Sequence, residues 1–276
     1  MKNLKYLSYK LREDCVNIIM AGGGGHIGGD MSVMEILTDL YFRQMNISPE
    51  NPEDPDRDLF ILSKGQSMEA YYAVLCEKEF LNLEEVTREF SKFGSKYIGH
   101  PNNKLPGIEM NSGSLGHGLP VSVGMALAVK MNKGPNRVYV VTGDGELAEG
   151  SNWEGAMSAA MYGLDNLVWI IDRNRLQISG NTEDVMALED LKRKAEAFGW
   201  NVISVDGNDI DEVDAALEKA KVCKGKPTCV IANTIKGKGS PIMENKAGWH
   251  HHLPTQEEYE QIMQDLEHQK EALKDE

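Results

Sequence analysis

The chain has 276 residues, of which 41% are hydrophobic and 26% are charged, and this composition favours a large folded domain over wholesale disorder. Its formal net charge of −14 argues against nucleic acid or an anionic membrane surface as the main partner. No apolar run reaches the roughly twenty residues of a membrane span, and the 4 cysteines form no Cys-x-x-Cys pair, so we expect a soluble, cytoplasmic protein with reduced thiols.

Apolar runs and amphipathic segments alternate along the chain and predict its fold. Helical spacing is expected over residues 4–20, 32–45, 68–80, 83–90, 119–131, 150 onward, 188–198, 210–222 and 255 onward. Short buried strands are expected over residues 59–62, 137–142, 167–171, 200–205 and 228–234. This alternation is typical of βαβ units, and it predicts an α/β fold with a mainly parallel, doubly wound sheet in a single domain over residues 1–276.

The first predicted helix ends in a glycine-rich loop, Gly22 to Gly29. The loop contains a formal G-x-G-x-x-G, but a dinucleotide fingerprint must follow a strand, and this one follows a helix. We therefore reject a nucleotide site here, and expect the glycines to let the backbone approach a ligand, with His26 presented from the loop. Ser32 and Glu35 then have the spacing of a capping box that would begin the next helix.

Further candidate binding residues follow in three loops. The strand over residues 59–62 is followed by Ser63-Lys64-Gly65-Gln66, and His100 lies in a loop ending at Pro101. The glycine-containing segment 111–118 precedes a helix, an arrangement in which main-chain groups can face a ligand.

The most informative stretch runs from Gly143 to Leu176. Asp144 and Asn174 each follow a buried strand, and the carboxyl ends of parallel strands are where open α/β sheets bind ligands. A carboxylate, an amide oxygen and the main-chain carbonyl of Leu176 are hard ligands that leave positions free for substrate oxygens, which suits Mg2+ on a diphosphate. Taken alone, the pattern is also compatible with an ordinary βαβ unit that has a Gly-Asp turn.

Near the end of the chain, Lys236-Gly237-Lys238-Gly239 lacks the first half of a P-loop, so a nucleoside triphosphate site is not expected. Trp249 is followed by His250, His251 and His252. Three adjacent histidines could be taken for a zinc tract, but neighbouring side chains diverge, which argues against one tetrahedral site.

These segments, in this order, resemble the transketolases. Gly143-Asp144-Gly145 with Asn174 is similar to the thiamin diphosphate motif, and Gly-Asp-Gly-Glu-Leu-Ala-Glu-Gly-Ser-Asn-Trp-Glu closely resembles transketolase itself. The resemblance implies a thiamin diphosphate-binding fold with Mg2+, for which Ca2+ or Mn2+ can substitute. It implies catalytic roles for His26, His100 and His250, and metal ligation by Asp144, Asn174 and Leu176. The cofactor-binding residues that it implies are Gln66, Gly113, Ser114, Leu115, Gly116, Gly145, Glu149, Asn174, Lys236 and His250, with Glu149 and Glu154 near a dimer interface.

The chain departs from the transketolase pattern at several positions. Ile27 replaces the usual proline after His26, His117 stands where many relatives have glutamine, and His251 stands where glycine is usual. Gln66 replaces a histidine beside the cofactor diphosphate and substrate. Glutamine can hydrogen-bond a sugar or phosphate oxygen but cannot carry a proton charge, so we expect an unusual ketose donor such as apulose 4-phosphate or a sulfo-sugar.

A complete transketolase also has a pyrimidine-binding domain and a third domain. The resemblance therefore implies the N-terminal subunit of a split transketolase, in an α2β2 assembly with a C-terminal subunit. Such an enzyme would transfer a two-carbon ketol unit from a ketose to an aldose, usually sugar phosphates of the pentose phosphate pathway. Two alternatives remain open at this point. One is a 2-oxo-acid dehydrogenase α subunit or a deoxyxylulose-phosphate synthase, and the other is a degenerate paralogue that binds only a partner.

Overall fold

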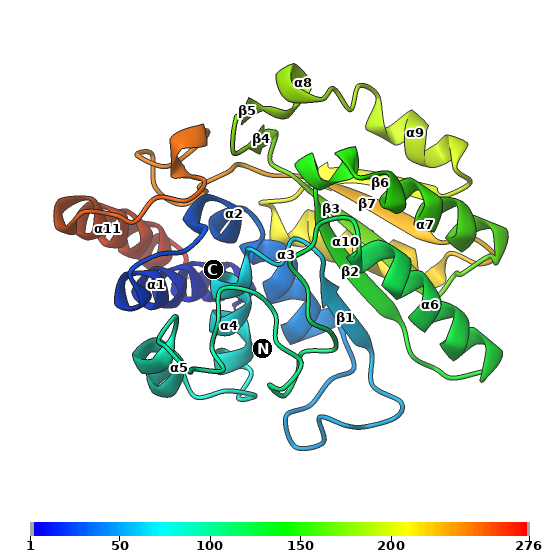
Figure 1. Cartoon of the computed structure of the whole chain (residues 1–276), viewed down its shortest axis with the longest axis horizontal. Coiled ribbons are helices and arrows are strands. Elements are labelled where there is room, and N and C mark those ends of the chain that lie inside the picture. Colours follow the sequence, from blue (N-terminus) through cyan, green and yellow to red (C-terminus); the bar gives the residue numbers. More distant parts are fainter. Residues whose placement is uncertain (1–2, 275–276) are drawn as a thin grey trace.

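Five apolar strands form a single parallel sheet in a computed structural model that describes residues 3–274 (Figure 1). The strands lie in the order β1-β2-β3-β7-β6, and every neighbouring pair is parallel. Their bounds are β1 Leu59–Leu62, β2 Val138–Gly143, β3 Leu167–Arg173, β7 Thr228–Asn233 and β6 Asn201–Asp206. The predicted mainly parallel, doubly wound sheet is confirmed.

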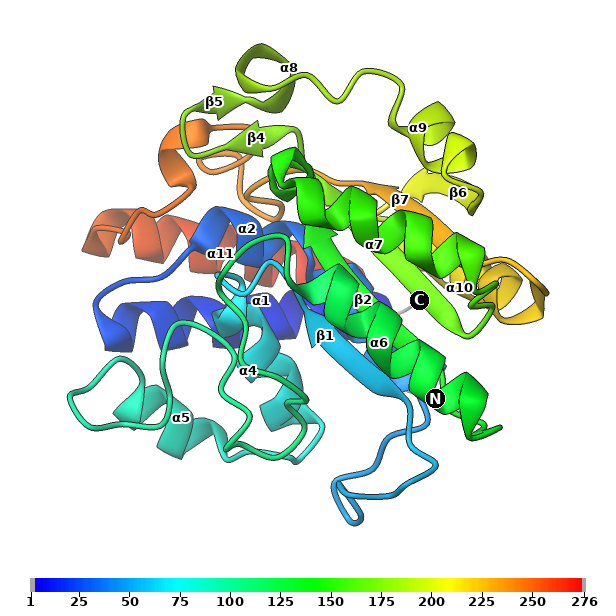
Figure 2. The same ribbon diagram turned by 45° about the vertical axis from the view of Figure 1, so that its right-hand side comes forward.

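Helices cover both faces of the sheet (Figure 2). One face carries α6 (Gly118–Met131), α7 (Gly150–Met161) and α9 (Leu191–Ala197). The other carries α1 (Leu4–Gly22), α2 (Ile27–Ser32), α3 (Met34–Asp39), α4 (Met68–Glu77), α10 (Ile210–Val222) and α11 (Gln256–Ala272), with α5 (Leu83–Glu89) packed outside α1 and α4. Within the described residues, every helix falls short of the length and apolar character that crossing a membrane requires.

Strand side chains alternate between the two cores. On β2, Tyr139 and Val141 pack with the helices of the α1 side, whereas Val138 and Val140 pack with α6 and α7. Because successive strand residues point to opposite faces, a continuous apolar run is what a strand buried on both faces requires. The fully buried Trp169 on β3 fills the α7 side, and its indole N–H donates to the Thr142 hydroxyl at 2.8 Å.

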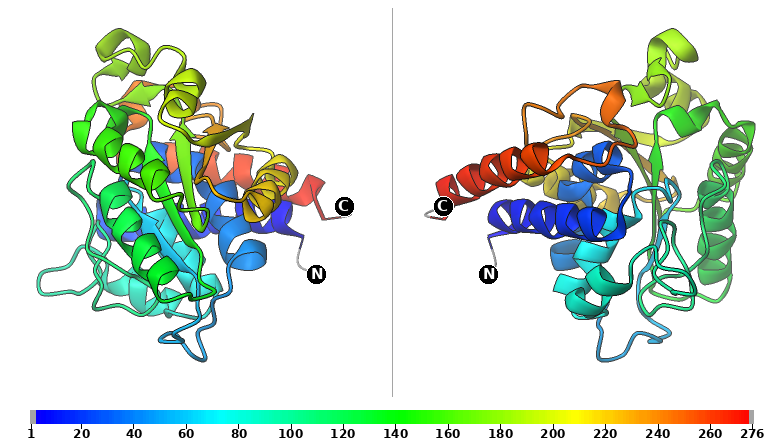
Figure 3. Two further views of the ribbon diagram at one scale, coloured as in Figure 1. Left: turned by 90° about the vertical axis from the view of Figure 1, so that its right-hand side faces the viewer. Right: turned by 60° about the vertical axis from the view of Figure 1, so that its left-hand side comes forward.

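The two ends of the described chain pack against each other. Helices α1 and α11 lie side by side on one flank of the sheet, opposite α6 and α7 (Figure 3). The Tyr9 hydroxyl donates to Gln269 at 2.7 Å, and Lys270 pairs with Glu13 at 2.6 Å. A capping box at Thr255 and Glu258 begins α11. The last predicted helix is thus part of the fold, and only its outer side is solvated.

The short elements gather at the carboxyl edge of the sheet. They are the 3-10 turn η2 (Gly145–Ala148), the strand pair β4 (Leu176–Gln177) and β5 (Gly180–Asn181), the single turn α8 (Thr182–Val185) and the 3-10 turn η3 (Ala247–Trp249). The β4–β5 pair and α8 lie above the ends of the long strands (Figure 1). None of these elements was predicted.

The predicted helix over residues 32–45 is wrong in its details. Ser32 is the last residue of α2, α3 follows after Val33, and Leu40–Gln44 forms a π-helical turn, η1. No capping box forms, because the Ser32 hydroxyl donates to Asp172 at 2.6 Å and Glu35 pairs with Arg12. Contacts with other segments thus take the two side chains that the capping motif would have used.

Candidate active site

The loops at the carboxyl edge of the sheet enclose a cleft of about 330 Å3. Strands β1, β2, β3 and β7 each end beside it, as expected for ligand binding in an open α/β sheet. The lining residues are His26, Gly29, Lys64, Gln66, His100, Gly113, Leu115, Gly143, Asp144, Gly145, Glu146, Asn174, Leu176, Gln177, Ile178, Lys236 and His250. The structure therefore brings together all three predicted catalytic histidines, all three predicted metal ligands and most of the predicted cofactor-binding residues.

Asp144 is held rigidly at the end of β2. Its carboxylate accepts the N–H of Gly145 at 2.8 Å and the N–H of Arg175 at 2.7 Å, so the β2 and β3 ends are tied together through it. Burial, followed by the negative charge of Asp172, raises the pKa of Asp144 to about 6. A buried carboxylate with a raised pKa gains stability from a nearby cation.

Asn174 and the Leu176 carbonyl complete the predicted metal-binding set. The Asn174 amide oxygen accepts the N–H of Leu176 at 3.2 Å, and Lys236 donates its ammonium to the Leu176 carbonyl at 2.8 Å. A positive charge thus already lies at one of the predicted metal ligands. Since one carboxylate and two neutral oxygens cannot complete an octahedral shell, the set suits a cation that takes its remaining oxygens from a diphosphate and water.

The predicted catalytic histidines lie in one group. The ring centroid of His26 is 5.5 Å from that of His250 and 6.3 Å from that of His100. Lys236 donates to Nδ1 of His250 at 2.7 Å, which leaves the proton of the neutral ring on Nε2. His250 therefore presents an N–H donor on its other side.

Burial lowers the pKa values of the three histidines and of Lys236, and it keeps the histidines uncharged at neutral pH. It lowers the pKa of His26 to about 4, with the neighbouring His251 and His100 as further causes, and burial also lowers the pKa of His100. For His250, burial and then Lys236 lower the pKa to about 3. Burial and then Lys64 lower the pKa of Lys236 to about 8. Neutral histidines at physiological pH can both donate and accept protons.

Asp172, which was not predicted as a site residue, anchors the floor of the cleft. It is fully buried and pairs with Lys64, and it accepts hydrogen bonds from Ser32 and Thr234. Lys64 also donates to the Gly29 carbonyl at 3.0 Å, so the glycine loop is fixed to the ends of β1 and β3. The sequence signal of Lys64 and Asp172 is a charged residue directly following, or ending, a buried strand.

Glu146 is a second residue that sequence reasoning missed. Its buried carboxylate accepts the Ser63 hydroxyl, the N–H of Gly116 at 2.9 Å and the N–H of Gly143 at 3.1 Å. These bonds join the loop before α6 to the ends of β1 and β2. At Gly116, φ is +83° and an added Cβ would lie 2.6 Å from Glu149 Cβ, so only glycine fits there.

Some predicted residues lie outside the cleft lining. Ser114 and Glu149 are exposed, and Gly116 is buried behind the loop. His117 is exposed before α6 and does not line the cleft. The three adjacent histidines diverge, because His251 contacts His26 with ring centroids at 4.6 Å, whereas His252 pairs with Glu258 at 2.8 Å. Within residues 3–274, no three side chains of His, Cys, Asp or Glu are grouped so that they could hold a metal ion.

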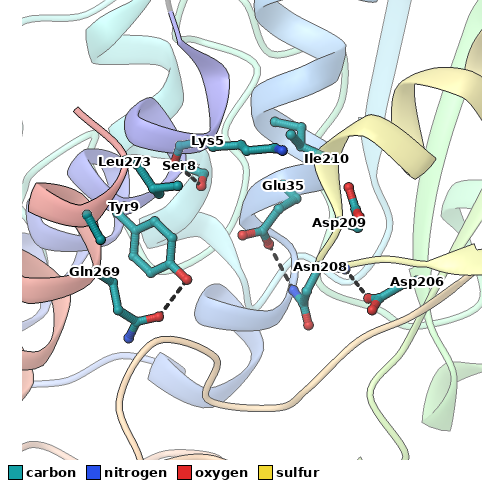
Figure 4. A pocket seen from close by; sticks show the side chains of 11 residues that line it. Lys5, Ser8, Tyr9, Glu35, Asp206, Asn208, Asp209, Ile210, Gln269 and Leu273 are labelled. Carbon is teal, nitrogen blue, oxygen red and sulfur yellow. Dashed lines mark hydrogen bonds between the residues drawn. The ribbon is translucent and has the colours of Figure 1, made fainter. Parts of the chain in front are cut away.

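A second cavity of about 490 Å3 lies between α1, α11 and the loop after β6 (Figure 4). Its polar side chains bond to one another: Tyr9 donates to Gln269 at 2.7 Å, and Asn208 donates to Glu35 at 2.8 Å (Figure 4). It contains none of the predicted site residues. The cleft at the carboxyl edge is therefore the candidate active site.

The fold and this cleft define an open α/β domain with a ligand-binding cleft at the carboxyl edge of its sheet. Residues 5–273 match the family "Transketolase, thiamine diphosphate binding domain". The chain belongs to this family, as a transketolase chain of the N-terminal, thiamin diphosphate-binding type.

Individual relatives agree with the family match. The chain is 45% identical over 276 residues to one subunit of the apulose-4-phosphate transketolase of Phocaeicola vulgatus, covering 100% of this chain and 98% of that one. It is 43% identical over 246 residues to one subunit of the 6-deoxy-6-sulfo-D-fructose transketolase of a Clostridium species, covering 89% of each. The solved transketolase of Leishmania mexicana superposes with a TM-score of 0.87 at 25% identity, covering 99% of this chain and 45% of that chain. The chain thus spans less than half of the Leishmania transketolase and nearly the full length of the Phocaeicola relative.

Proposed function

We propose that this chain is the N-terminal subunit of a two-chain transketolase that transfers a two-carbon ketol unit from a ketose donor to an aldose acceptor. The observation that carries the proposal is the cleft, which combines a cation-seeking carboxylate, Asp144, with the neutral histidines His26, His100 and His250. The length of the Phocaeicola relative, and its name as one subunit of an enzyme, support the role as one chain of two. Residues 1–276 would form one cofactor-binding domain.

Asp144, Asn174 and the Leu176 carbonyl would hold Mg2+, and Lys236 and His250 would face the diphosphate. The donors fit, because they are hard oxygens and because Asp144 lacks a cationic side-chain partner in the described structure. When bound, thiamin diphosphate supplies the electron sink for cleaving and forming a carbon–carbon bond next to a carbonyl.

The histidines would manage protons at substrate oxygens. His250 carries its proton on Nε2 because Lys236 donates to Nδ1, so it can donate a hydrogen bond to a developing alkoxide. His26 and His100, both neutral, can accept a proton from a donor hydroxyl and return it to the acceptor oxygen. Gln66, also in the cleft, can contact sugar oxygens without changing charge.

The donor is proposed to be an unusual ketose, such as apulose 4-phosphate or a sulfo-sugar. Relatives named for those donors match this chain over 98% and 89% of their own lengths, and Gln66 stands where transketolases usually have histidine. The pentose phosphate pathway is accordingly a less favoured setting for this chain.

A C-terminal subunit would supply the other half of the cofactor pocket, in an α2β2 assembly. The outer sides of α6 and α7 expose the large apolar residues Val121, Met131, Met157 and Met161, next to the exposed acids Glu149 and Glu154. Such a surface supports burial against another chain. Ile178, which lines the cleft, is exposed as well.

Mixing the chain with a separately expressed C-terminal transketolase subunit tests this function. Ketol transfer should appear only in the mixture, with thiamin diphosphate and Mg2+ present, since either chain alone lacks half of the site. Turnover by the highly purified single chain would contradict the two-chain proposal, and no turnover in the mixture with any ketose would contradict the transketolase proposal.

A further inference from the structure

Two buried acids, Asp30 and Glu69, lie behind the glycine loop that carries His26. Asp30 comes from α2 and Glu69 from the first turn of α4, and their exposed fractions are 0% and 1%. Neither residue lines the cleft. Burying two ionised carboxylates together is strongly unfavourable, so an arrangement of this kind requires a physical explanation.

The hydrogen bonds of the pair leave one oxygen of each acid without an N–H or hydroxyl donor. Oδ1 of Asp30 accepts the N–H of Ala70 at 3.0 Å, whereas Oδ2 of Asp30 and Oε2 of Glu69 have no such donor. The two side chains lie close enough to interact with each other electrostatically. The nearby ammonium of Lys64 is already bonded to Asp172 and the Gly29 carbonyl. A proton shared between the two acids would give both Oδ2 of Asp30 and Oε2 of Glu69 a hydrogen-bond partner.

The pair also contacts the His26 loop directly. The loop packs so closely against Glu69 that a Cβ on Gly25 would lie 2.7 Å from its Oε1. Cys15 of α1 and Tyr72 of α4 face the pair from the other sides. The position of the His26 backbone therefore depends on the side chain of Glu69, which in turn depends on Asp30.

We propose that Asp30 and Glu69 share one proton as a buried acid pair, and that this pair fixes the His26 loop against α4. Both would be positioning residues for His26, since neither touches the cleft. The inference rests on the proposed function only in the claim that the position of His26 matters for turnover. Burial raises the pKa of both acids, which supports a retained proton.

Infrared spectroscopy of the chain alone tests the shared proton. At neutral pH, the native spectrum should contain a protonated-carboxyl band that disappears in both Glu69→Gln and Asp30→Asn, because in each variant an amide N–H replaces the shared proton. Asp39→Asn is the matched control, since Asp39 is equally buried, with its pKa raised by burial to about 7, at the end of α3. Asp39→Asn should leave the band of the pair intact. Absence of any band that both substitutions remove would overturn the shared proton.

Activity of the assembled two-chain enzyme tests the positioning role. Gly25→Ala pushes the loop off Glu69, and Glu69→Leu removes the carboxylate against which the loop packs, so each should lower kcat by about 100-fold with little change in KM. Glu69→Gln, which keeps the length of that side chain and one of its oxygens, should stay within about threefold of native. Gly24→Ala is the control, because a Cβ there meets nothing within 4 Å.

Native kcat in both Gly25→Ala and Glu69→Leu would overturn the positioning role. If Glu69→Leu fails to fold, the comparison of Gly25→Ala with Gly24→Ala still decides the question. If the native complex has no ketol-transfer activity, the proposed function fails, while the infrared result still stands as a test of the pair.

Discussion

Individual side chains in the cleft have protonation states that are set by burial. His26 and His250 are kept neutral because water is largely excluded and because cationic neighbours oppose a further positive charge. Asp144 experiences the opposite effect, in which burial beside Asp172 favours the neutral carboxyl. Burial thus disfavours the charged forms of these three side chains until a cation and a diphosphate bind together.

Histidine titration tests this electrostatic picture. By NMR, His26 should titrate near pH 4 and His250 near pH 3, below the ordinary pKa of about 6.5. Because the unfolded chain binds these protons more readily, folding stability should fall as pH drops from about 6.5 toward the folded-state pKa values. For the partly exposed His250 ring this loss is about 1 kcal/mol at pH 5 after allowance for solvent screening. Ordinary titration of both rings would contradict the account.

Replacement of Gln66 tests its role in donor choice. If glutamine selects an unusual ketose, Gln66→His in the assembled enzyme should raise kcat/KM for xylulose 5-phosphate relative to apulose 4-phosphate by about tenfold. A residue that contacts only the cofactor acts equally on every substrate and cannot change that ratio. An unchanged ratio with altered cofactor affinity would therefore remove the donor-selecting role. The exposed Asp184→Asn variant serves as the control.

The sequence predicted candidate site residues that belong to a short local motif. It did not predict residues whose importance depends on contacts with distant parts of the chain. Asp144 and Asn174 were predicted because each directly follows a buried strand, and the structure brings them together. Lys64, Asp172 and Glu146 were missed, because their partners lie far away in the sequence, as in the Lys64–Asp172 pair. Lys64 and Asp172 carry the local signal of a charged residue at a strand end, but nothing nearby in the sequence shows which distant residue each one pairs with.

Among the elements, the strands were predicted most accurately. Strand β2, predicted over residues 137–142, is Val138–Gly143, because a continuous β-branched run buried on both faces has few alternatives. The helix predicted over residues 32–45 is broken instead, since Ser32 and Glu35 are used in tertiary contacts. The β4–β5 pair was not predicted, because strands of this length have no periodicity to detect.

The break between α2 and α3 is stabilised by a buried ion pair that joins α1 to α3. Both terminal nitrogens of the Arg12 guanidinium bond to Glu35 at 2.7 Å, and Arg12 also donates to the Met31 carbonyl at 2.8 Å. Arg12→Met should lower the free energy of unfolding by about 3–5 kcal/mol, because the buried carboxylate of Glu35 is left without a cationic partner.

Urea unfolding measures this loss. The matched control is Lys192→Ala in the exposed Lys192–Glu196 pair, which should change the free energy of unfolding by less than about 0.5 kcal/mol. Equal effects of the two substitutions would show that the buried pair does not hold α1 and α3 together.

On the scale of the whole molecule, the sheet places the ends of β1, β2, β3 and β7 around one cleft, and the helices on both faces make that edge rigid. The same arrangement exposes apolar residues on α6, on α7 and at the cleft rim. The cofactor site is open to solvent on one side and lies next to an apolar surface. We expect this arrangement in a domain whose pocket is completed by another chain.

The most direct test of the central claim is calorimetric titration of the assembled two-chain complex with thiamin diphosphate. The native complex should bind the cofactor only when Mg2+ is present. Asp144→Ala should weaken binding by at least about 100-fold, because the site loses its only charged metal ligand beside a multiply charged diphosphate. Asp184→Asn, at an exposed acid on the same side of the molecule, should bind as the native complex does. Unchanged, metal-independent binding in Asp144→Ala would contradict the assignment of this cleft as the cofactor site.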